Sequence, residues 1–339
     1  MERLRITELL GDGIGPELRE SVHAVAAALP LEVEFLPVDL SLERRRRGST
    51  AAYDEVEASI RETRIALKYP TVTEAESPNA LLRQRLKFSV IHRPVLSIRG
   101  ISSNFKEDVA LEIVRVATGG TYDDPGQRIG EDVAVSLRIV ERRPCTEAAR
   151  FAFEYARKNK LTVTSSSKHT IQRATDGFFE AIVRDVARSY PDVRHRVELF
   201  DALLAKVILR PHDYQVVLVL NEYGDFLSDM ACGLVGSLGT GASGNYAFRP
   251  DGSIDVAMFD PAGGTAPDIA GKGIANPTAA LLAFVLALDH AGRAVLANAL
   301  RKAVLDAIAD GKSTADVGGK LDTRAFTAVV TDALADALA

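Results

Sequence analysis

The sequence predicts an α/β protein built around a parallel or mixed sheet. Short β-branched runs alternate along the chain with amphipathic stretches of helical period. Val216–Leu220 is a near-continuous apolar run, which is typical of a strand buried on both faces. The length of 339 residues favours about two domains. Because no repeat or low-complexity linker separates them, we expect the two domains to be interwoven.

The predicted elements follow one another closely along the chain. Leu4–Leu10 is a predicted strand, Gly11-Asp12-Gly13 a turn, and Pro16–Ala28 a helix with proline in its first turn. Helical spacing of apolar residues predicts further helices at Glu147–Lys158, Asp176–Ser189 and Ala279–Ala291. Turn residues crowd Gly119–Gly130, and the alternating segment Asp132–Glu141 is expected to pair as a strand.

The composition argues against several classes of partner. The formal charge of −5 disfavours nucleic acid, for which a basic patch is expected. The run Arg44–Arg47 is an exception, and we interpret it as a solvated helix end or loop. Cys145 and Cys232 lack CxxC spacing and a nearby histidine, which favours reduced thiols in a cytosolic protein. We see no signal-peptide pattern, and Ala279–Leu288 is too short to span a bilayer, so we expect a cytoplasmic protein without a membrane partner.

Two carboxylates follow the buried strand within the segment Asn221–Asp229. Asp225 and Asp229 are four residues apart, so in a helix they face the same side, one turn apart. Carboxylates that converge on one point need a cation, and oxygen ligands suit Mg²⁺ or Mn²⁺. Spacing alone favours the plainer interpretation, in which one aspartate caps the helix while the other is solvated.

Three arginines on separate predicted elements form a second candidate group. Arg83, Arg93 and Arg115 would suit a di- or tricarboxylate, because a guanidinium binds a carboxylate with two hydrogen bonds. Surface salt bridges are the alternative interpretation. Tyr122 and Lys168 lie among small or polar residues and could transfer protons, although on their own they would be an ordinary tyrosine and lysine.

These segments resemble one family when they are taken together and in order. They are LLGDGIGPEL, SPNALLRQRL with the following Arg93-Pro94, Arg115–Tyr122, Lys168, NEYGDFLSD, and GTAPDIAGKGIANPTAA. The chain resembles the β-decarboxylating 3-hydroxyacid dehydrogenases, which include isocitrate, isopropylmalate, homoisocitrate and tartrate dehydrogenases. The resemblance covers nearly the whole chain.

The resemblance implies the isocitrate/isopropylmalate dehydrogenase fold rather than a Rossmann fold. A large nucleotide-binding domain would comprise residues 1–89 and 238–339. A smaller domain, residues 90–237, would carry substrate and metal sites, dimer contacts and a clasp-like arm near 126–142. The expected assembly is a homodimer with shared active sites, in which Lys168 and Asp201 reach across from the partner subunit.

The resemblance also implies roles for individual residues. Lys168 is the candidate base at the substrate alcohol, and Tyr122 is the candidate acid that protonates the enol. The implied substrate-binding residues are Ser77, Asn79, Arg83, Arg93 and Arg115. The implied metal ligands, for Mg²⁺ or Mn²⁺, are Asp201, Asp225 and Asp229. The implied cofactor-binding residues are Ile14, Thr73, Gly263, Gly264, Thr265, Ala266, Asp268, Ile269 and Asn276.

The pocket pattern resembles that of NAD-dependent isocitrate dehydrogenases. Ser77 and Asn79 offer polar groups to an anionic substituent, where isopropylmalate dehydrogenases tend to carry apolar residues. Asp268 would accept hydrogen bonds from the adenosine ribose and repel a 2′-phosphate, which favours NAD. Another 3-substituted malate, or a regulatory subunit without catalytic activity, are the alternatives.

Four residues depart from the family pattern near the expected cofactor site. They are Gly263 for histidine, Thr170 for asparagine, Val116 for glutamate, and Tyr69 for glycine. Tyr69 is expected to place a bulky ring beside the cleft. We expect NAD to bind more weakly, or in a different pose, than in typical relatives.

Overall fold

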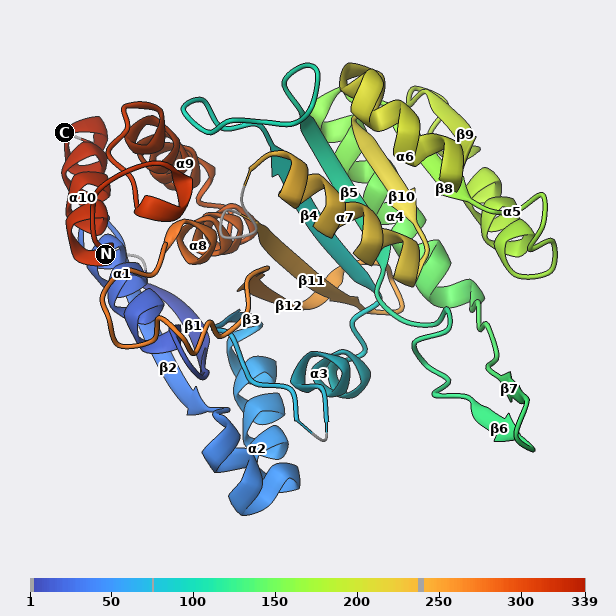
Figure 1. Ribbon diagram of the computed structural model, residues 1–339, viewed down its shortest axis with the longest axis horizontal. Coiled ribbons are helices and arrows are strands. Elements are labelled where there is room, and N and C mark those ends of the chain that lie inside the picture. The colour runs from blue at the N-terminus through green and yellow to red at the C-terminus, as the bar shows by residue number, and fades with distance from the viewer. Residues whose placement is uncertain (1–2, 75, 237–240, 339) are drawn as a thin grey trace.

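One ten-stranded mixed sheet runs through the whole molecule (Figure 1). The computed structural model describes residues 3–74, 76–236 and 241–338. The strand order is β2-β1-β3-β12-β11-β4-β5-β10-β8-β9. The strands β2, β1, β3 and β12 are parallel to one another, as are β5, β10, β8 and β9. Antiparallel pairing through β11 and β4 joins these two groups. The predicted α/β fold with a mixed sheet is confirmed.

The strands have the following bounds: β1 Arg3–Leu10, β2 Glu32–Asp39, β3 Ile65–Lys68, β4 Val90–Leu96, β5 Ala110–Val116, β6 Gln127–Ile129, β7 Val133–Val135, β8 Val163–Ser167, β9 His195–Leu199, β10 Val216–Val219, β11 Ala242–Phe248 and β12 Ile254–Pro261. The helices are α1 Gly15–Ala27, α2 Leu42–Thr63, α3 Pro78–Leu86, α4 Arg142–Asn159, α5 Asp176–Ala187, α6 Phe200–Leu209, α7 Asn221–Leu234, α8 Thr278–His290, α9 Ala294–Ala309 and α10 Thr323–Leu338, with short 3₁₀ turns at Pro211–Asp213 and Ala315–Val317.

The hydrophobic core lies between the sheet and the helices that cover it. Helix α8 is apolar on nearly every side, and Phe284 and Leu288 are completely buried. An all-apolar helix belongs in the interior of a protein, because no face of it gains from contact with water. Helices α1, α9 and α10 pack around α8 or one another at one end of the sheet (Figure 1).

The four helices predicted from the sequence correspond to α1, α4, α5 and α8. These predictions are confirmed, with ends that differ by a few residues.

The arm near residues 126–142 is a protruding two-stranded ribbon (Figure 1). Its strands β6 and β7 form a two-stranded sheet of their own among the residues that the structure describes, and Ile129 and Val133 are half exposed. The alternating segment Asp132–Glu141 was expected to form one strand, but only Val133–Val135 does so. Within the described residues, the remainder has no neighbouring strand except at Ile139, which forms an isolated bridge with Gly120.

The proposed domain limits remain a prediction, and the second limit, at 237/238, lies outside the described residues. Cys145 and Cys232 are free and buried. No helix in the described ranges combines the length and apolarity needed to cross a membrane.

Candidate active site

Helix α7 presents the two predicted aspartates on one face. The helix begins at Asn221, directly after β10, so Asp225 and Asp229 lie one turn apart as expected. From the neighbouring strand β4, Nη1 of Arg93 donates to Oγ of Ser228 at 2.7 Å and to Oδ1 of Asp229 at 3.0 Å. One arginine therefore holds the polar face of α7 against the sheet.

Arg115 on β5 contacts the same helix. Its Nε donates to Oδ1 of Asn221 at 2.9 Å, and its Nη1 forms an ion pair with Asp225. Gly224 makes this approach possible, because a Cβ there would lie 2.6 Å from Cβ and Cγ of Arg115. Arg93 and Arg115 are diagonal neighbours on one face of the β4–β5 pair, since Arg93 is in register with Ile113.

The three predicted arginines lie close enough to repel one another. Burial, followed by the charge of Arg83, lowers the pKa of Arg115 to about 10. Burial also lowers the pKa of Arg83, and the charge of Arg93 adds to that effect. Asp225 and Asp229 compensate Arg115 and Arg93 in part, and a further anion would stabilise the cluster of three cations. The cluster is therefore well suited to a ligand with more than one carboxylate.

Several polar atoms of this cluster have no protein partner. Nε of Arg83, Nε of Arg93 and Oδ1 of Asn79 are buried without a hydrogen-bond partner among the described residues. A buried polar group without a partner costs about 1–3 kcal/mol. A bound ligand that supplies the missing partners would remove this cost.

Tyr122 joins the same group. Its hydroxyl donates to Oδ2 of Asp225 at 3.1 Å, and its ring lies 5.9 Å from the guanidinium carbon of Arg115. Burial, reinforced by the Asp225 carboxylate, raises the pKa of Tyr122. For Asp225, burial would raise the pKa, but Arg115 and Arg93 outweigh it and the pKa is lowered. The pair therefore consists of a protonated tyrosine and an ionised aspartate at neutral pH.

Lys168 and Asp201 form a separate pair. Lys168 follows β8, Asp201 lies in the first turn of α6 after β9, and Nζ to Oδ1 is 2.8 Å. The hydrogen bond from Lys168 lowers the pKa of Asp201. Within residues 3–74, 76–236 and 241–338, no three His, Cys, Asp or Glu side chains come close enough to hold a metal ion. A single chain thus does not bring Asp201 to Asp225 and Asp229.

The loop before α3 carries the predicted Ser77. Its Oγ accepts a hydrogen bond from the amide of Ala80 at 3.4 Å and caps the helix, while Pro78 occupies the first turn. Pro78 therefore occupies a normal helix-start position. Thr73 lies exposed in the same connection.

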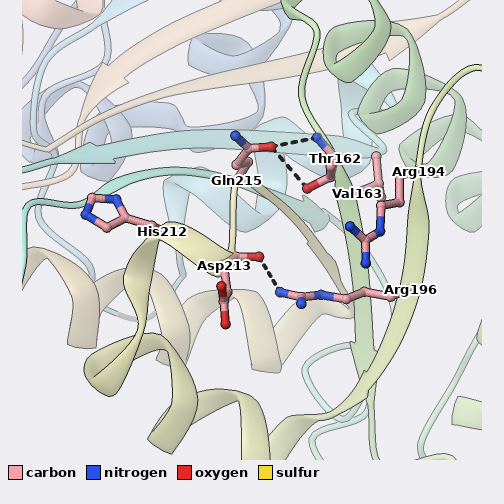
Figure 2. A pocket seen from close by; sticks show the side chains of 7 residues that line it. All are labelled: Thr162, Val163, Arg194, Arg196, His212, Asp213 and Gln215. Carbon is pink, nitrogen blue, oxygen red and sulfur yellow. Dashed lines mark hydrogen bonds between the residues drawn. The ribbon is translucent and has the colours of Figure 1, made fainter.

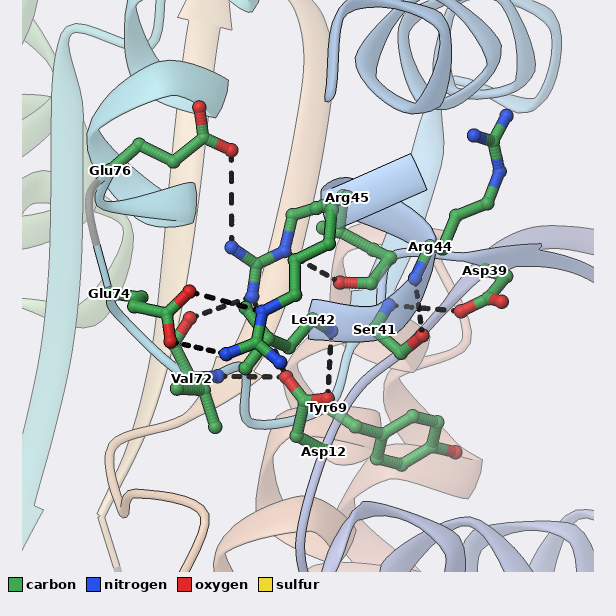
Figure 3. A network of polar contacts seen from close by, with 12 residues as sticks. Asp12, Asp39, Ser41, Leu42, Arg44, Arg45, Tyr69, Val72, Glu74 and Glu76 are labelled. Carbon is green, nitrogen blue, oxygen red and sulfur yellow. Dashed lines mark hydrogen bonds and ion pairs between the residues drawn. The ribbon is translucent and has the colours of Figure 1, made fainter. Parts of the chain in front are cut away.

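A buried arginine anchors this connection (Figure 3). Nη2 of Arg45 donates to the carbonyl of Val72 at 2.7 Å, and its Nε donates to the carbonyl of Leu40 at 3.1 Å. Asp12 accepts hydrogen bonds from the amides of Leu42 and Val72, both at 2.8 Å. The prediction that Arg44–Arg47 is solvated is thus wrong for Arg45, because helix α2 turns this side chain toward the carbonyls of Leu40 and Val72.

The glycine-rich loop after β12 packs against the first turn of the chain. The amide of Ile14 donates to the carbonyl of Thr265 at 3.0 Å, and a Cβ on Gly13 would overlap that carbonyl. Among the described residues, no atom lies within 4 Å of where a Cβ on Gly263 or Gly264 would project, and Asp268 is exposed. Ala266 has a positive φ of 39° and Ile269 is partly buried. Nδ2 of Asn276 is held by Asp316 at 2.9 Å.

Tyr69 does not lie beside the cleft, so that expectation is wrong. Its side chain is almost completely buried, and its hydroxyl donates to Oε1 of Glu8 at 3.0 Å. Glu8 is also bound by Arg19 at 2.8 Å and His23 at 2.7 Å. The ring points into the core because this buried acidic group provides a partner for its hydroxyl.

A small cavity elsewhere contains none of the predicted site residues (Figure 2). It measures about 260 Å³ and lies at the amino ends of β8 and β10. Thr162 and Gln215 line it, together with Arg194 and Arg196. Lys168 and Asn221 follow the carboxyl ends of these strands, where α/β proteins place their ligands.

Sequence reasoning missed several residues that support the site. Asn221 and Ser228 orient Arg115 and Arg93, and they lie within a segment already singled out for its aspartates. Lys68 is buried, and burial lowers its pKa while the nearby Asp260 opposes the shift. In the sequence, only its position directly before Tyr69, which replaces the family's glycine, drew attention to Lys68.

Comparison with known proteins decides the family. Residues 5–337 match the family model for isocitrate/isopropylmalate dehydrogenase. The chain belongs to the isocitrate/isopropylmalate dehydrogenase family. It is 35% identical to isocitrate dehydrogenase [NAD] subunit 2 of Schizosaccharomyces pombe, with 95% of this chain and 85% of the relative covered. It is also 35% identical to a mitochondrial regulatory subunit of the NAD isocitrate dehydrogenase of Dictyostelium discoideum, over 95% of this chain and 90% of the relative.

A solved structure supports the same conclusion. The isocitrate dehydrogenase of Methylococcus capsulatus superposes with a TM-score of 0.89 at 32% identity, covering 98% of this chain and 99% of that chain. The chain is accordingly a decarboxylating hydroxyacid dehydrogenase by family.

The residues present fit the two groups that this family implies. Asp225 and Asp229 offer carboxylate oxygens from one helix face, the donor type that Mg²⁺ and Mn²⁺ prefer. Arg93 and Arg115 neutralise both aspartates in this structure. At the glycine-rich loop, the open space at Gly263 lets a cofactor approach the backbone.

Proposed function

We propose that this family member oxidises an isocitrate-like 3-substituted malate with NAD and releases its β-carboxylate as CO₂. The observation that carries the proposal is the convergence of Arg83, Arg93 and Arg115 beside Asp225 and Tyr122. The NAD isocitrate dehydrogenases among its relatives support the choice of cofactor and substrate class.

The arginines and the α3 loop would bind the substrate. Arg83 and Arg93 each retain a buried nitrogen that has no partner in the part of the chain that the structure describes, and a substrate carboxylate can accept hydrogen bonds from both. Ser77 and Asn79 lie at the start of α3, on the same helix as Arg83. Their polar groups would face the third carboxylate and so distinguish an isocitrate-like acid from one with an apolar substituent.

Two residues would move the protons. Lys168 would accept the proton of the C2 hydroxyl as hydride leaves C2, and Tyr122 would donate a proton to C3 after CO₂ has left. The raised pKa of Tyr122 keeps its hydroxyl protonated for that second step. NAD would supply the hydride acceptor, and Asp225 and Asp229 would hold a divalent cation, which would supply Lewis-acid chemistry.

We further propose that a homodimer completes each site. Lys168 pairs with Asp201, whereas Tyr122 pairs with Asp225, so a single chain divides the proposed acid and base between two clusters. A second copy that supplies Lys168 and Asp201 would unite them and add the third carboxylate ligand. Cytoplasmic location stays a prediction.

Two alternatives share the same fold. A different 3-substituted malate, such as isopropylmalate, homoisocitrate or tartrate, would use the same arginines with another substituent. A regulatory role is the second, since the Dictyostelium discoideum relative, of equal identity, is named for that role. The presence of Tyr122, Lys168, Asp201, Asp225 and Asp229 in this chain favours catalysis.

NADH formation by the purified chain tests the substrate directly. We expect turnover of isocitrate with NAD and Mn²⁺, and much weaker turnover with NADP or with the other malates. The absence of isocitrate turnover, with clear turnover of another acid, would replace the substrate. Activity only after a homologous subunit is added would favour the regulatory alternative.

A mixing experiment tests the shared sites. Tyr122→Phe and Lys168→Met chains should each be inactive alone. Hybrid dimers contain one site with both residues intact, so random mixing should restore about a quarter of the wild-type activity. If the co-expressed mixture contains hybrid dimers and remains inactive, each site uses residues from one chain only.

A further inference from the structure

We propose that Arg138 is a positioning residue that couples the loop of Tyr122 to the loop of Lys168 within one chain. The catalytic part of this inference rests on the proposed function of Tyr122 and Lys168, whereas the contacts of Arg138 are independent of that function. Arg138 lies at the base of the protruding arm, just after β7, and its side chain is 15% exposed. Its guanidinium reaches both loops through two buried carboxylates.

Asp176 connects Arg138 to the Lys168 loop. This carboxylate at the start of α5 is completely buried. Nε of Arg138 donates to its Oδ1 at 2.9 Å, and the backbone amide of Lys168 donates to its Oδ2 at 2.7 Å. The hydroxyl of Tyr223 also donates to Oδ2, at 3.0 Å. The orientation of Asp176 therefore fixes the backbone from which the Lys168 side chain projects.

Glu222 connects Arg138 to the Tyr122 loop. Nη1 of Arg138 donates to Oε1 of Glu222, in the first turn of α7. The same oxygen accepts a hydrogen bond from the amide of Thr121 at 3.1 Å. A Cβ on Gly120 would overlap the Glu222 carboxylate, so backbone and side chain are in close contact here. Glu222 thus determines the position of the residue directly before Tyr122.

The backbone of the arm reinforces this connection. The amide of Gly120 donates to the carbonyl of Ile139 at 2.7 Å, and the amide of Ile139 donates back to Gly120 at 2.9 Å. This bridge places Arg138 beside the Tyr122 loop. The guanidinium carbon of Arg138 lies 4.7 Å from the centre of the Tyr223 ring. This cation–π contact restricts the orientation of the guanidinium between its two carboxylate partners.

Arg138 is chemically suited to this position, and lysine is not. The planar guanidinium binds two carboxylates in fixed directions, whereas an ammonium group is a single point charge on a flexible chain. Removal of the guanidinium leaves Asp176 and Glu222 buried without their shared counter-charge. Each carboxylate can then reorient, so that the backbone amides of Lys168 and Thr121 lose their acceptors.

This connection has a consequence for catalysis. In a dimer with shared sites, the Tyr122 and Lys168 loops of one chain serve different active sites. Arg138 would then position the proposed acid, Tyr122, in one active site and the proposed base, Lys168, in the other. Substitution of Arg138 should lower the kcat of both sites, with little change in KM, because the arginines that bind substrate lie elsewhere.

The test combines hydrogen exchange with kinetics in the full-length protein. Arg138→Gln should accelerate amide exchange at both Thr121 and Lys168 and lower kcat by about ten-fold or more. Arg138→Lys should give a smaller effect on both measures. Arg188→Gln is the matched control, because Arg188 is an exposed residue at the end of α5 that forms a local, solvent-exposed pair with Asp185.

The outcomes separate this inference from the proposed function. Exchange that accelerates at one loop only, or at neither, overturns the coupling. Exchange that accelerates at both loops while kcat stays at the wild-type value shows coupling without a role in positioning, and overturns the inference as stated. A wild-type protein without turnover refutes the proposed function, and the exchange measurement still tests whether Arg138 couples the loops.

Discussion

Replacement of Arg45 by methionine should destabilise the protein far more than replacement of its exposed neighbour Arg47. Methionine retains much of the aliphatic packing but removes the two hydrogen bonds to the carbonyls of Leu40 and Val72. It also removes the cation that lies 3.6 Å from Asp12. Asp12 keeps two backbone amide donors, so the loss is only partial.

The magnitude follows from these contacts. Hydrogen bonds from a charged group contribute about 1.5–3 kcal/mol each, and removal of one partner of a buried ion pair costs about 3–5 kcal/mol. Because the retained donors of Asp12 offset part of this cost, we expect about 3 kcal/mol of lost stability. At about 2.1 cal/mol/K per residue, 339 residues give an unfolding entropy of about 0.7 kcal/mol/K, and hence a shift in Tm of about 4 °C.

Thermal unfolding followed by circular dichroism measures this shift. The control Arg47→Met removes a solvent-exposed pair with Glu43 on the same helix. Such a pair contributes about 0.3–0.5 kcal/mol, so the control should shift Tm by less than about 1 °C. If both variants shift Tm by the same small amount, the interpretation of Arg45 as a buried anchor is wrong.

Three further predictions concern the site and its surroundings. Gly224→Ala should lower kcat/KM, because its Cβ would displace Arg115. Gly233→Ala lies on the same helix with space for a Cβ, so it should be neutral for kcat/KM and neutral or stabilising by up to about 1 kcal/mol. Equal changes in kcat/KM for the two variants would refute the argument that Arg115 approaches Gly224 closely. Gly263→His should tighten NAD binding by about two- to ten-fold, as an aromatic contact of about 0.5–1.5 kcal/mol, and unchanged affinity in a fluorescence titration would contradict this. Burial would raise the pKa of Glu8, but the hydrogen bonds from His23 and Arg19 outweigh burial and lower it. The ionised Glu8 carboxylate therefore stabilises the folded protein above the pKa that Glu8 has in the unfolded chain, and this stabilisation is lost as pH falls through the pKa of the folded state. Glu8→Gln should therefore destabilise the protein at pH 7, with a difference that shrinks below about pH 4 in acid unfolding curves; a pH-independent difference would exclude this linkage.

Part of the site could be predicted from local sequence. The spacing of Asp225 and Asp229, directly after a buried strand, fixed their common face as soon as a helix formed there. Residue type alone made the three arginines a candidate group, and the family resemblance implied that they bind substrate. Their mutual repulsion, and the partnerless atoms of Arg83 and Arg93, emerge only when α3, β4 and β5 lie side by side.

The direction of single side chains could not be predicted in the same way. Arg45 lies in a run of four arginines and Tyr69 in a short loop, and sequence reasoning placed both in contact with solvent or the cleft. Both are buried, because each meets acceptors from distant segments, the Val72 carbonyl for Arg45 and Glu8 for Tyr69. Such partners have no local signal, since they are brought together only by packing of the sheet.

The sequence by itself determined the α/β class, most helices and strands, and the residue types of the site, because periodicity and turn chemistry act over a few residues. Only the tertiary structure decided which polar groups meet. It paired Tyr122 with Asp225, Lys168 with Asp201, and Arg138 with two buried carboxylates. The physical reason is that a buried charge is stable only where another element supplies its partner, and that placement depends on the whole fold.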